Sequence, residues 1–132
     1  MHIKNVPVGD LETNCYIVYL EERDDAVLID PGADAPRIIK ALEDRRPAAV
    51  LLTHGHFDHT GALHAFADTP IYIHEMDQVM LLDSHYSFGS VANDNAPRPK
   101  ASGFVKEGQT LEVAGIRFEV LHTPGHTRGC VC

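Results

Sequence analysis

Cysteine is scarce in this sequence of 132 residues, which holds Cys15, Cys130 and Cys132. Three cysteines, two of them clustered, are too few for a disulfide framework. We therefore expect a reducing compartment, the cytoplasm. Cys130 and Cys132 form C-x-C, but two thiols alone make a weak metal motif. Alternate positions on one strand are the simpler interpretation of that pair.

Basic residues and long apolar runs are also in short supply. The chain has 11 Lys and Arg against 19 Asp and Glu, for a formal net charge of -8. Nucleic acids and anionic membranes bind basic faces, so this balance argues against both as partners. No run is apolar for long enough to span a bilayer, and the N-terminal M-H-I-K-N-V-P-V-G-D lacks an apolar signal core. We expect a small-molecule substrate instead.

Several familiar sequence signatures are absent. There is no internal repeat, and 132 residues fit one domain. A G-x-S-x-G elbow is missing, which disfavours a serine hydrolase. The phosphate-binding G-x-x-x-x-G-K-[ST] is missing too, which excludes a P-loop nucleotide enzyme.

Hydrophobic patterning predicts an α/β layered domain. β-Branched and apolar runs predict strands over 14–20, 25–30, 48–53 and 71–74, and helical spacing predicts helices over 35–46, 61–66 and 75–83. We expect Asp34 to cap the first helix. Residues 84–103 predict a long polar loop, for which a mobile surface loop is favoured over the alternative of a substrate lid. Residues 109–123 predict a hairpin that turns at Ala114 and Gly115.

Metal-ligating side chains follow the predicted third strand at once, in T-H-G-H-F-D-H. His54 and His56 are two residues apart, so on extended backbone they point to one side and can bind one ion together. Asp58 and His59 follow a turn at Phe57 and can point into a second, adjacent position. Imidazole with carboxylate suits zinc, and also iron or manganese.

The candidate for a third ligand of the first ion is His126 in T-P-G-H-T, where Pro124 and Gly125 force a tight turn that presents it. Both ligand clusters begin where a strand ends, and sites in α/β sheets gather on such loops. Three protein ligands leave a position open for water, which marks a catalytic site. The other five histidines are read as ordinary half-buried residues: His2, His64, His74, His85 and His122.

These motifs resemble those of the metallo-β-lactamase superfamily. T-H-G-H-F-D-H looks like its signature, and T-P-G-H-T, L-I-D-P-G (28–32) and N-C-Y-I-V (14–18) are similar to its glyoxalase II-like, or hydroxyacylglutathione hydrolase-like, branch. The resemblance implies an αββα sandwich, of which about the first half is present. We expect residues 1–132 to form one metallo-β-lactamase-like domain that is truncated at its C-terminus.

The resemblance also assigns roles to the candidate residues. One metal would be held by three histidines, His54, His56 and His126. Asp58 and His59 would help to hold a second metal, Asp58 would act beside the attacking water, and Asp30 would support the site from behind the ligands. The family's bridging aspartate and last histidine cannot be assigned in this chain. A half sandwich would expose a sheet face and an open edge, so we expect a homo-oligomer or a missing C-terminal half as partner.

The resulting functional hypothesis is a metal-dependent hydrolase, with zinc as the expected metal. A divalent metal lowers the pKa of bound water to roughly 7, so that hydroxide can attack a substrate carbonyl. The resemblance to glyoxalase II favours a thioester. Two alternatives stay open: an iron-dependent persulfide dioxygenase of the same superfamily, and a catalytically incomplete metal-binding half-domain.

Overall fold

The computed structural model describes residues 1–132 as an α/β fold around a six-stranded sheet, as the sequence predicts. The strands are β1 (His2–Val8), β2 (Thr13–Tyr19), β3 (Asp25–Ile29), β4 (Arg46–Leu51), β5 (Ile71–His74), β6 (Gly103–Val105), β7 (Thr110–Val113) and β8 (Ile116–Glu119). The helices are α1 (Ala35–Leu42), α2 (Phe57–Thr60) and α3 (Gln78–Leu82), with 3₁₀ turns η1 (Leu63–Phe66) and η2 (Glu75–Asp77). No helix has the length and apolarity needed to cross a membrane.

The large sheet has the strand order β1-β2-β3-β4-β5-β6, with β1 and β6 at its edges. β1, β2 and β3 are antiparallel neighbours, whereas β3, β4, β5 and β6 run parallel. The carboxyl ends of β3, β4 and β5 therefore meet at one edge of the sheet. The loops that follow these three strands lie together there, where parallel sheets usually carry their sites.

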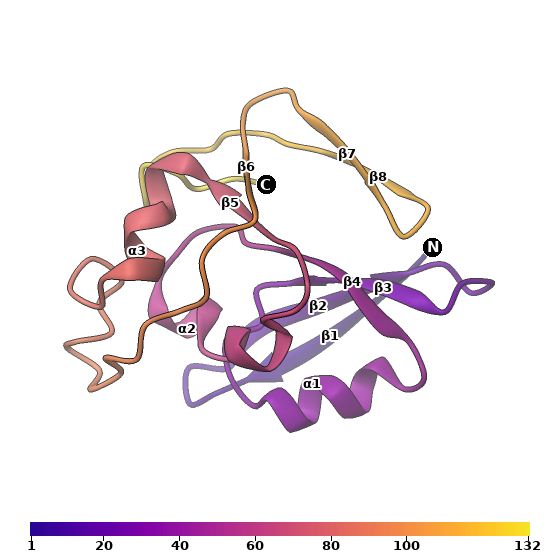
Figure 1. The fold of residues 1–132 in the computed structure, drawn as a ribbon, viewed down its shortest axis with the longest axis horizontal. Coiled ribbons are helices and arrows are strands. Elements are labelled where there is room, and N and C mark those ends of the chain that lie inside the picture. Colours follow the sequence, from indigo (N-terminus) through magenta and orange to yellow (C-terminus); the bar gives the residue numbers. More distant parts are fainter.

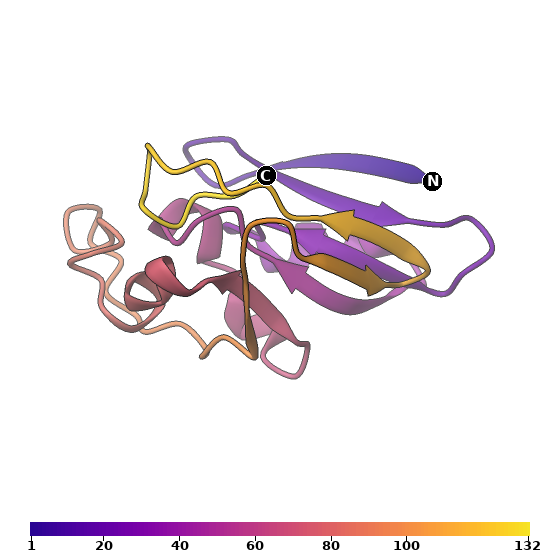
Figure 2. The same ribbon diagram turned by 90° about the horizontal axis from the view of Figure 1, so that it is seen from above.

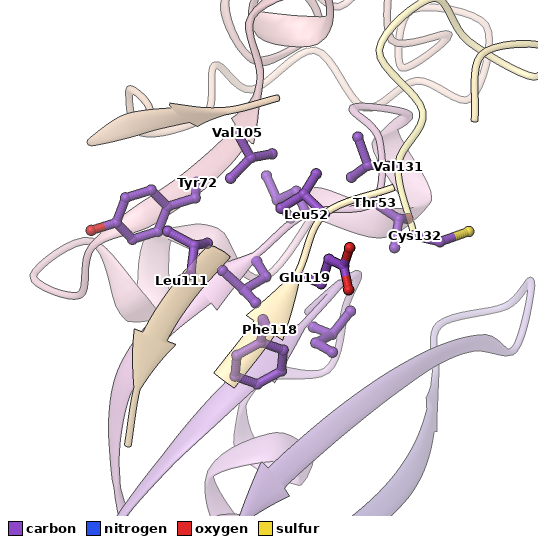
Figure 3. A pocket seen from close by; sticks show the side chains of 12 residues that line it. Leu52, Thr53, Tyr72, Val105, Leu111, Phe118, Glu119, Val131 and Cys132 are labelled. Atoms are coloured by element: carbon purple, nitrogen blue, oxygen red, sulfur yellow. The ribbon is translucent and has the colours of Figure 1, made fainter. Parts of the chain in front are cut away.

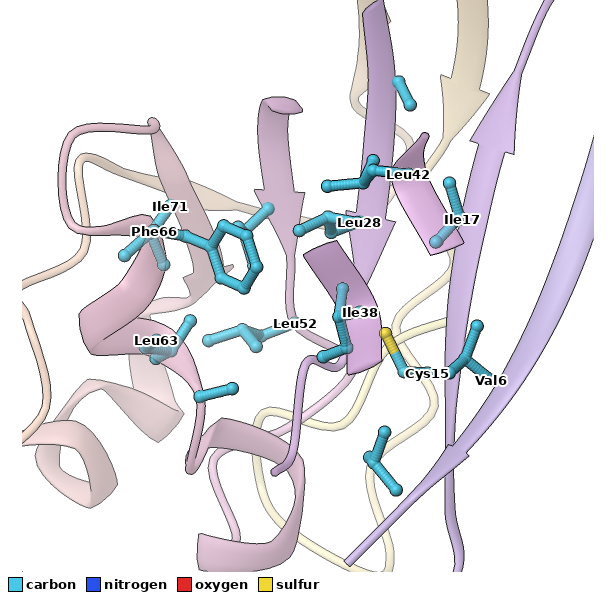
Figure 4. Close-up of a cluster of buried hydrophobic side chains, with 14 of the residues drawn as sticks. Val6, Cys15, Ile17, Leu28, Ile38, Leu42, Leu52, Leu63, Phe66 and Ile71 are labelled. Atoms are coloured by element: carbon cyan, nitrogen blue, oxygen red, sulfur yellow. The ribbon is translucent and has the colours of Figure 1, made fainter. Parts of the chain in front are cut away.

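One face of the sheet packs against α1 and forms the main core (Figure 4). Ile38 and Leu42 of α1 are buried against Ile17 and Leu28 of the sheet. Their spacing of four residues places both side chains on the same side of the helix, so this short helix has one apolar face. Burial of such a face, rather than helix propensity, stabilises a helix of this length.

The opposite face is covered in part by the hairpin of β7 and β8, so it is less exposed than the half-sandwich argument predicts (Figures 1 and 2). Ala114 and Gly115 both have positive φ, 53° and 75°, which suits a two-residue hairpin turn. Val18 and Val27, on this face of β2 and β3, are buried. An apolar cavity of about 100 Å³ remains between hairpin and sheet, where Leu111 and other side chains converge (Figure 3).

Several local predictions need correction. β1 was not predicted, because only Val6 and Val8 of this edge strand are buried and Pro7 weakens the strand pattern. The first helix ends at Leu42 rather than near residue 46. Asp34 does not cap it: the residue has φ 53°, and its Oδ2 accepts a hydrogen bond from the Gly9 backbone N–H at 2.8 Å.

The later helical segments are shorter than predicted, and the long loop is anchored. Residues 61–66 form mainly a 3₁₀ turn, and 75–83 divide into η2 and α3. The loop over 84–103 is irregular, as predicted, until β6 begins. Its buried Arg98 donates to both carboxylate oxygens of Asp94 at 2.9 and 2.8 Å, and to the Thr60 hydroxyl at 3.0 Å. These bonds fix part of the loop to α2.

Candidate metal centre

The segment after β4 is fastened to the end of β3 by one carboxylate. Asp30 directly follows β3 and is buried, with φ 53°. Its Oδ1 accepts from the Thr53 backbone N–H at 2.8 Å, and its Oδ2 accepts from the Thr53 hydroxyl at 2.5 Å. Two loops that are far apart in sequence are thereby held together just before the first histidine.

Three histidine rings converge at this edge of the sheet. The imidazole nitrogens of His54, His56 and His126 that could bind an ion all lie within 4.8 Å of one another. His56 Nδ1 and His126 Nε2 are 3.0 Å apart. The ring centroids of His54 lie 4.9 Å from those of both other histidines. The structure thus brings together the three residues that the sequence assigns to a first ion.

The tautomer of His54 is set by a short chain of hydrogen bonds. The Thr53 hydroxyl donates to Asp30, so it is free to accept from His54 Nδ1–H, which lies 3.0 Å away. This arrangement leaves His54 Nε2 unprotonated. That atom is buried and has no hydrogen-bond partner. Such an orphaned acceptor is costly in a folded protein unless something binds it.

The site chemistry fits a divalent metal ion. Burial, and after it the neighbouring His59, lower the pKa of His54 to about 4. Burial, and then the nearby His126, also lower the pKa of His56. Both rings are therefore neutral at physiological pH, which is the form that binds metals. Two nitrogens on one tetrahedral Zn²⁺ lie roughly 3.3 Å apart, given Zn–N bonds of about 2.0–2.1 Å, and the 3.0 Å between His56 and His126 is close to that spacing.

Asp58 and His59 lie beside this group on α2. His59 Nδ1 donates to Asp30 Oδ2 at 2.9 Å, which leaves Nε2 facing Asp58 Oδ2 at 3.5 Å. The Thr13 hydroxyl donates to the same Asp58 oxygen at 3.0 Å. The His59 and His54 ring centroids are 4.1 Å apart. A turn was predicted at Phe57, whereas in the structure the short helix α2 begins at that residue.

Electrostatics distinguish His59 from the other histidines. Burial by itself lowers its pKa, but the hydrogen bond to Asp30 and the charges of Asp30 and Asp58 outweigh burial and raise it. Asp30, His54 and His59 also form a second group whose ligand atoms lie within 4.8 Å. Both oxygens of Asp30 already accept hydrogen bonds, as a supporting residue requires. The supporting role of Asp30 stays a prediction.

Three contributors to this region were not singled out by the sequence: Thr13, Thr53 and Asp77. Thr13 and Thr53 hold Asp58 and Asp30 through their hydroxyl groups. Threonine is common in strands, so neither residue gives a distinctive signal. Asp77 is fully buried, yet E-M-D-Q-V-M-L-L-D is typical of a surface helix, in which an aspartate is expected to face solvent.

Apolar side chains flank the histidines on one side. A pocket beside His56 and His126 is bounded by Met76, Tyr86 and Phe88. These three apolar residues are more than half exposed. The Phe88 ring lies edge-on to His56, with ring centroids 5.1 Å apart. The candidate centre therefore opens to solvent beside an apolar wall.

Comparison with known proteins places this arrangement in a family. Residues 8–132 match the model of the metallo-beta-lactamase superfamily. The chain is 37% identical to hydroxyacylglutathione hydrolase GloC of Haemophilus influenzae, over 98% of this chain and 64% of that protein. The crystal structure of BLEG-1 B3 metallo-beta-lactamase superposes with a TM-score of 0.91 at 35% identity, over 98% of this chain and 65% of that one. TTHA1623 in a di-iron-bound form superposes with a TM-score of 0.78 at 33% identity, over 97% and 64%. The chain thus spans just under two thirds of the length of these proteins.

Proposed function

Since this chain belongs to the metallo-β-lactamase superfamily, we propose that it is a cytoplasmic metal-dependent hydrolase that cleaves small thioesters of the hydroxyacylglutathione type. One observation carries the metal-dependent part: three histidines from two separate loops converge, and the buried Nε2 of His54 has no partner. The thioester part is supported by 37% identity to a hydroxyacylglutathione hydrolase.

The proposed ligands of the first ion are His54 Nε2, His56 Nδ1 and His126 Nε2. The structure supports these atoms because His54 Nδ1 is already engaged by Thr53, and because the His56 and His126 nitrogens face each other at 3.0 Å. Zinc is the metal we propose, since three imidazoles with an open position suit it.

His59 and Asp58 are the proposed contributors to a second ion. His59 presents Nε2, because its Nδ1 is held by Asp30. Asp58 has one oxygen fixed by Thr13, which keeps the carboxylate beside His59 rather than in solvent. Iron or manganese would also accept this mixed set of imidazole and carboxylate ligands.

When bound, a divalent metal supplies Lewis acidity and brings the pKa of bound water to roughly 7. Asp58, whose carboxylate Thr13 orients, would accept a proton from the attacking water. Asp30 keeps His59 Nδ1 protonated, so that Nε2 remains available as a ligand. A thiolate leaving group, whose thiol has a pKa of about 8.5, departs without a dedicated acid.

The test combines metal analysis with turnover. Purified chain is assayed for bound zinc, iron and manganese, and for hydrolysis of a 2-hydroxyacyl glutathione thioester. We expect zinc at near-stoichiometric level and hydrolysis that is lost in His54→Ala and His56→Ala. The matched control is His2→Ala, because the exposed ring of His2 lies on the edge strand β1, where it stacks on Tyr19 of β2.

Each result decides between the hypotheses. Hydrolysis that persists in both histidine variants would refute a metal-dependent reaction. Bound iron with oxygen consumption on glutathione persulfide would replace the hydrolase with the dioxygenase. Bound metal with no turnover of either substrate would favour the metal-binding half-domain.

A further inference from the structure

Asp77 is a buried carboxylate that the proposed chemistry does not use. It ends η2, immediately before α3, and has no exposed surface. Its Oδ1 accepts from the Gly129 backbone N–H at 2.8 Å. Its Oδ2 accepts from the Gly55 backbone N–H at 3.1 Å and from the Thr127 hydroxyl at 2.7 Å. Asp77 takes part in none of the ion pairs of the structure.

These three donors belong to the two segments that carry the histidines. Gly55 lies between His54 and His56, and Thr127 directly follows His126. The two segments are far apart in sequence, since 70 residues separate His56 from His126. Figure 1 shows the C-terminal segment running from β8 towards α3 and back.

The balance of burial and hydrogen bonding makes these contacts mutually dependent. A buried carboxylate without a cationic partner is tolerated only when N–H and O–H groups satisfy its oxygens. Here a single residue takes donors from both segments. Moving either segment away would leave part of the charge unsatisfied, so Asp77 holds the two segments at a fixed separation.

Backbone packing at the same place is close. A Cβ on Gly129 would lie 2.7 Å from Asp77 Oδ1, and a Cβ on Gly55 would lie 2.6 Å from the Met80 Cβ. Glycine at both positions lets the two backbones approach η2 and α3 directly. This approach places both backbone N–H groups within reach of the carboxylate.

The His126 side chain, by contrast, has little support of its own. It is exposed, and its ring nitrogen forms a hydrogen bond with His56 alone. Its position is therefore determined by the backbone on either side of it. A bond from Val131 N–H to the Thr53 carbonyl, at 2.9 Å, ties the segments further along the chain. Asp77 ties them next to the ligand itself.

We propose that Asp77 is a positioning residue that sets the distance of His126 from His54 and His56, and so assembles the first metal site. This inference rests on the proposed function for the identity of the ligands. Asp77 itself binds neither metal nor substrate. It acts through Gly55 on one segment and through Thr127 and Gly129 on the other.

The decisive variant is Asp77→Asn, which keeps the shape of the side chain. Asparagine offers one acceptor oxygen and one NH₂ group, whereas the site presents two backbone N–H donors on opposite oxygens. In either orientation one of these N–H groups faces an NH₂ and loses its acceptor. Thr127→Val is the second variant, because it removes one donor and leaves the carboxylate in place.

The assay is cobalt titration of the metal-free chain, followed by visible spectroscopy. We expect Asp77→Asn to bind Co²⁺ about 10- to 100-fold more weakly, the range typical of residues that orient metal ligands. We also expect its spectrum to shift as His126 moves, and Thr127→Val to change in the same direction by less. Ile38→Val is the matched control, since it loosens the core under α1 without touching either segment, and it should leave the affinity unchanged.

Amide hydrogen exchange of the metal-free chain separates the two proposals. Faster exchange in Asp77→Asn at Gly55 or Gly129, whichever loses its acceptor, supports the inference, even if the wild-type chain binds no cobalt and the proposed function fails. Wild-type cobalt affinity and spectrum in Asp77→Asn would overturn the inference and leave the metal site intact. Unchanged exchange at both glycines would overturn it as well.

Discussion

Replacing Asp30 with asparagine should reverse the protonation of two proposed ligands. In the structure, Asp30 Oδ2 accepts from both the Thr53 hydroxyl and His59 Nδ1–H, at 2.5 and 2.9 Å. With asparagine, the oxygen stays with the Thr53 backbone N–H and the NH₂ group takes the Oδ2 position. Thr53 Oγ1 then accepts from asparagine and donates to His54 Nδ1. His54 and His59 both become protonated at Nε2, the atoms proposed to bind metal.

The size of the effect follows from the bonds that change. Asp30 is buried, and charge-assisted hydrogen bonds contribute about 1.5–3 kcal/mol each, against about 0.5–1.5 kcal/mol for neutral ones. We expect Asp30→Asn to lower the free energy of unfolding by about 1–3 kcal/mol, and metal affinity by about 10- to 100-fold. Urea denaturation measures the first quantity and metal titration the second.

Nitrogen-15 NMR of the metal-free chain reads the tautomers directly. Wild-type protein should show His54 and His59 protonated at Nδ1, and Asp30→Asn should show both protonated at Nε2. Asp24→Asn, at an exposed carboxylate in the turn before β3, serves as the control. Unaltered tautomers together with wild-type stability in Asp30→Asn would refute the hydrogen-bond argument.

Two further predictions concern packing and pH. In Gly32→Ala a Cβ would lie 1.8 Å from the Asp58 carbonyl oxygen, so α2 must move. We expect urea denaturation to show that the free energy of unfolding falls by about 1–3 kcal/mol. In the control Gly125→Ala the added Cβ meets nothing within 4 Å, so the free energy of unfolding should change by less than about 0.5 kcal/mol. The hydrogen bond from Arg98 lowers the pKa of Asp94. This pair therefore stabilises the fold fully at pH values above the ordinary aspartate pKa of about 3.9. The stabilisation is lost as the pH falls through the lowered pKa. The stability difference between wild type and Asp94→Asn, measured by urea denaturation, should therefore be constant from pH 7 to about pH 5 and close in stronger acid; a difference that grows towards acid would contradict the prediction.

Local patterns predicted the elements whose stability is itself local. The strands expected at 14–20 and 25–30 correspond to β2 and β3 within about a residue, because both are runs rich in apolar and β-branched residues and turn residues bound them. The hairpin over 109–123 is confirmed for the same reason. The helix α2 was not predicted because F-D-H-T is short and polar, and Arg98 of a distant loop bonds to Thr60 and to the Phe57 carbonyl. Asp34 shows the converse, since a long-range bond to Gly9 displaced the capping role that its position suggested.

In the candidate site, too, local sequence predicts some features and long-range contacts determine the others. His54 and His56 could be paired from sequence, because a strand end fixes the direction of residues two apart. The approach of His126 depends instead on the chain returning across the sheet after β8, and spacing alone carries no information about that return. Asp77 makes the reason explicit: its burial depends on hydrogen bonds from Gly55 and Thr127, two segments that meet only in the folded chain. Asp77, which lies in an apparently amphipathic helix, is thus fully hydrogen-bonded only when the two histidine segments have come together. The Asp77→Asn experiment tests that step of assembly separately from the hydrolysis reaction.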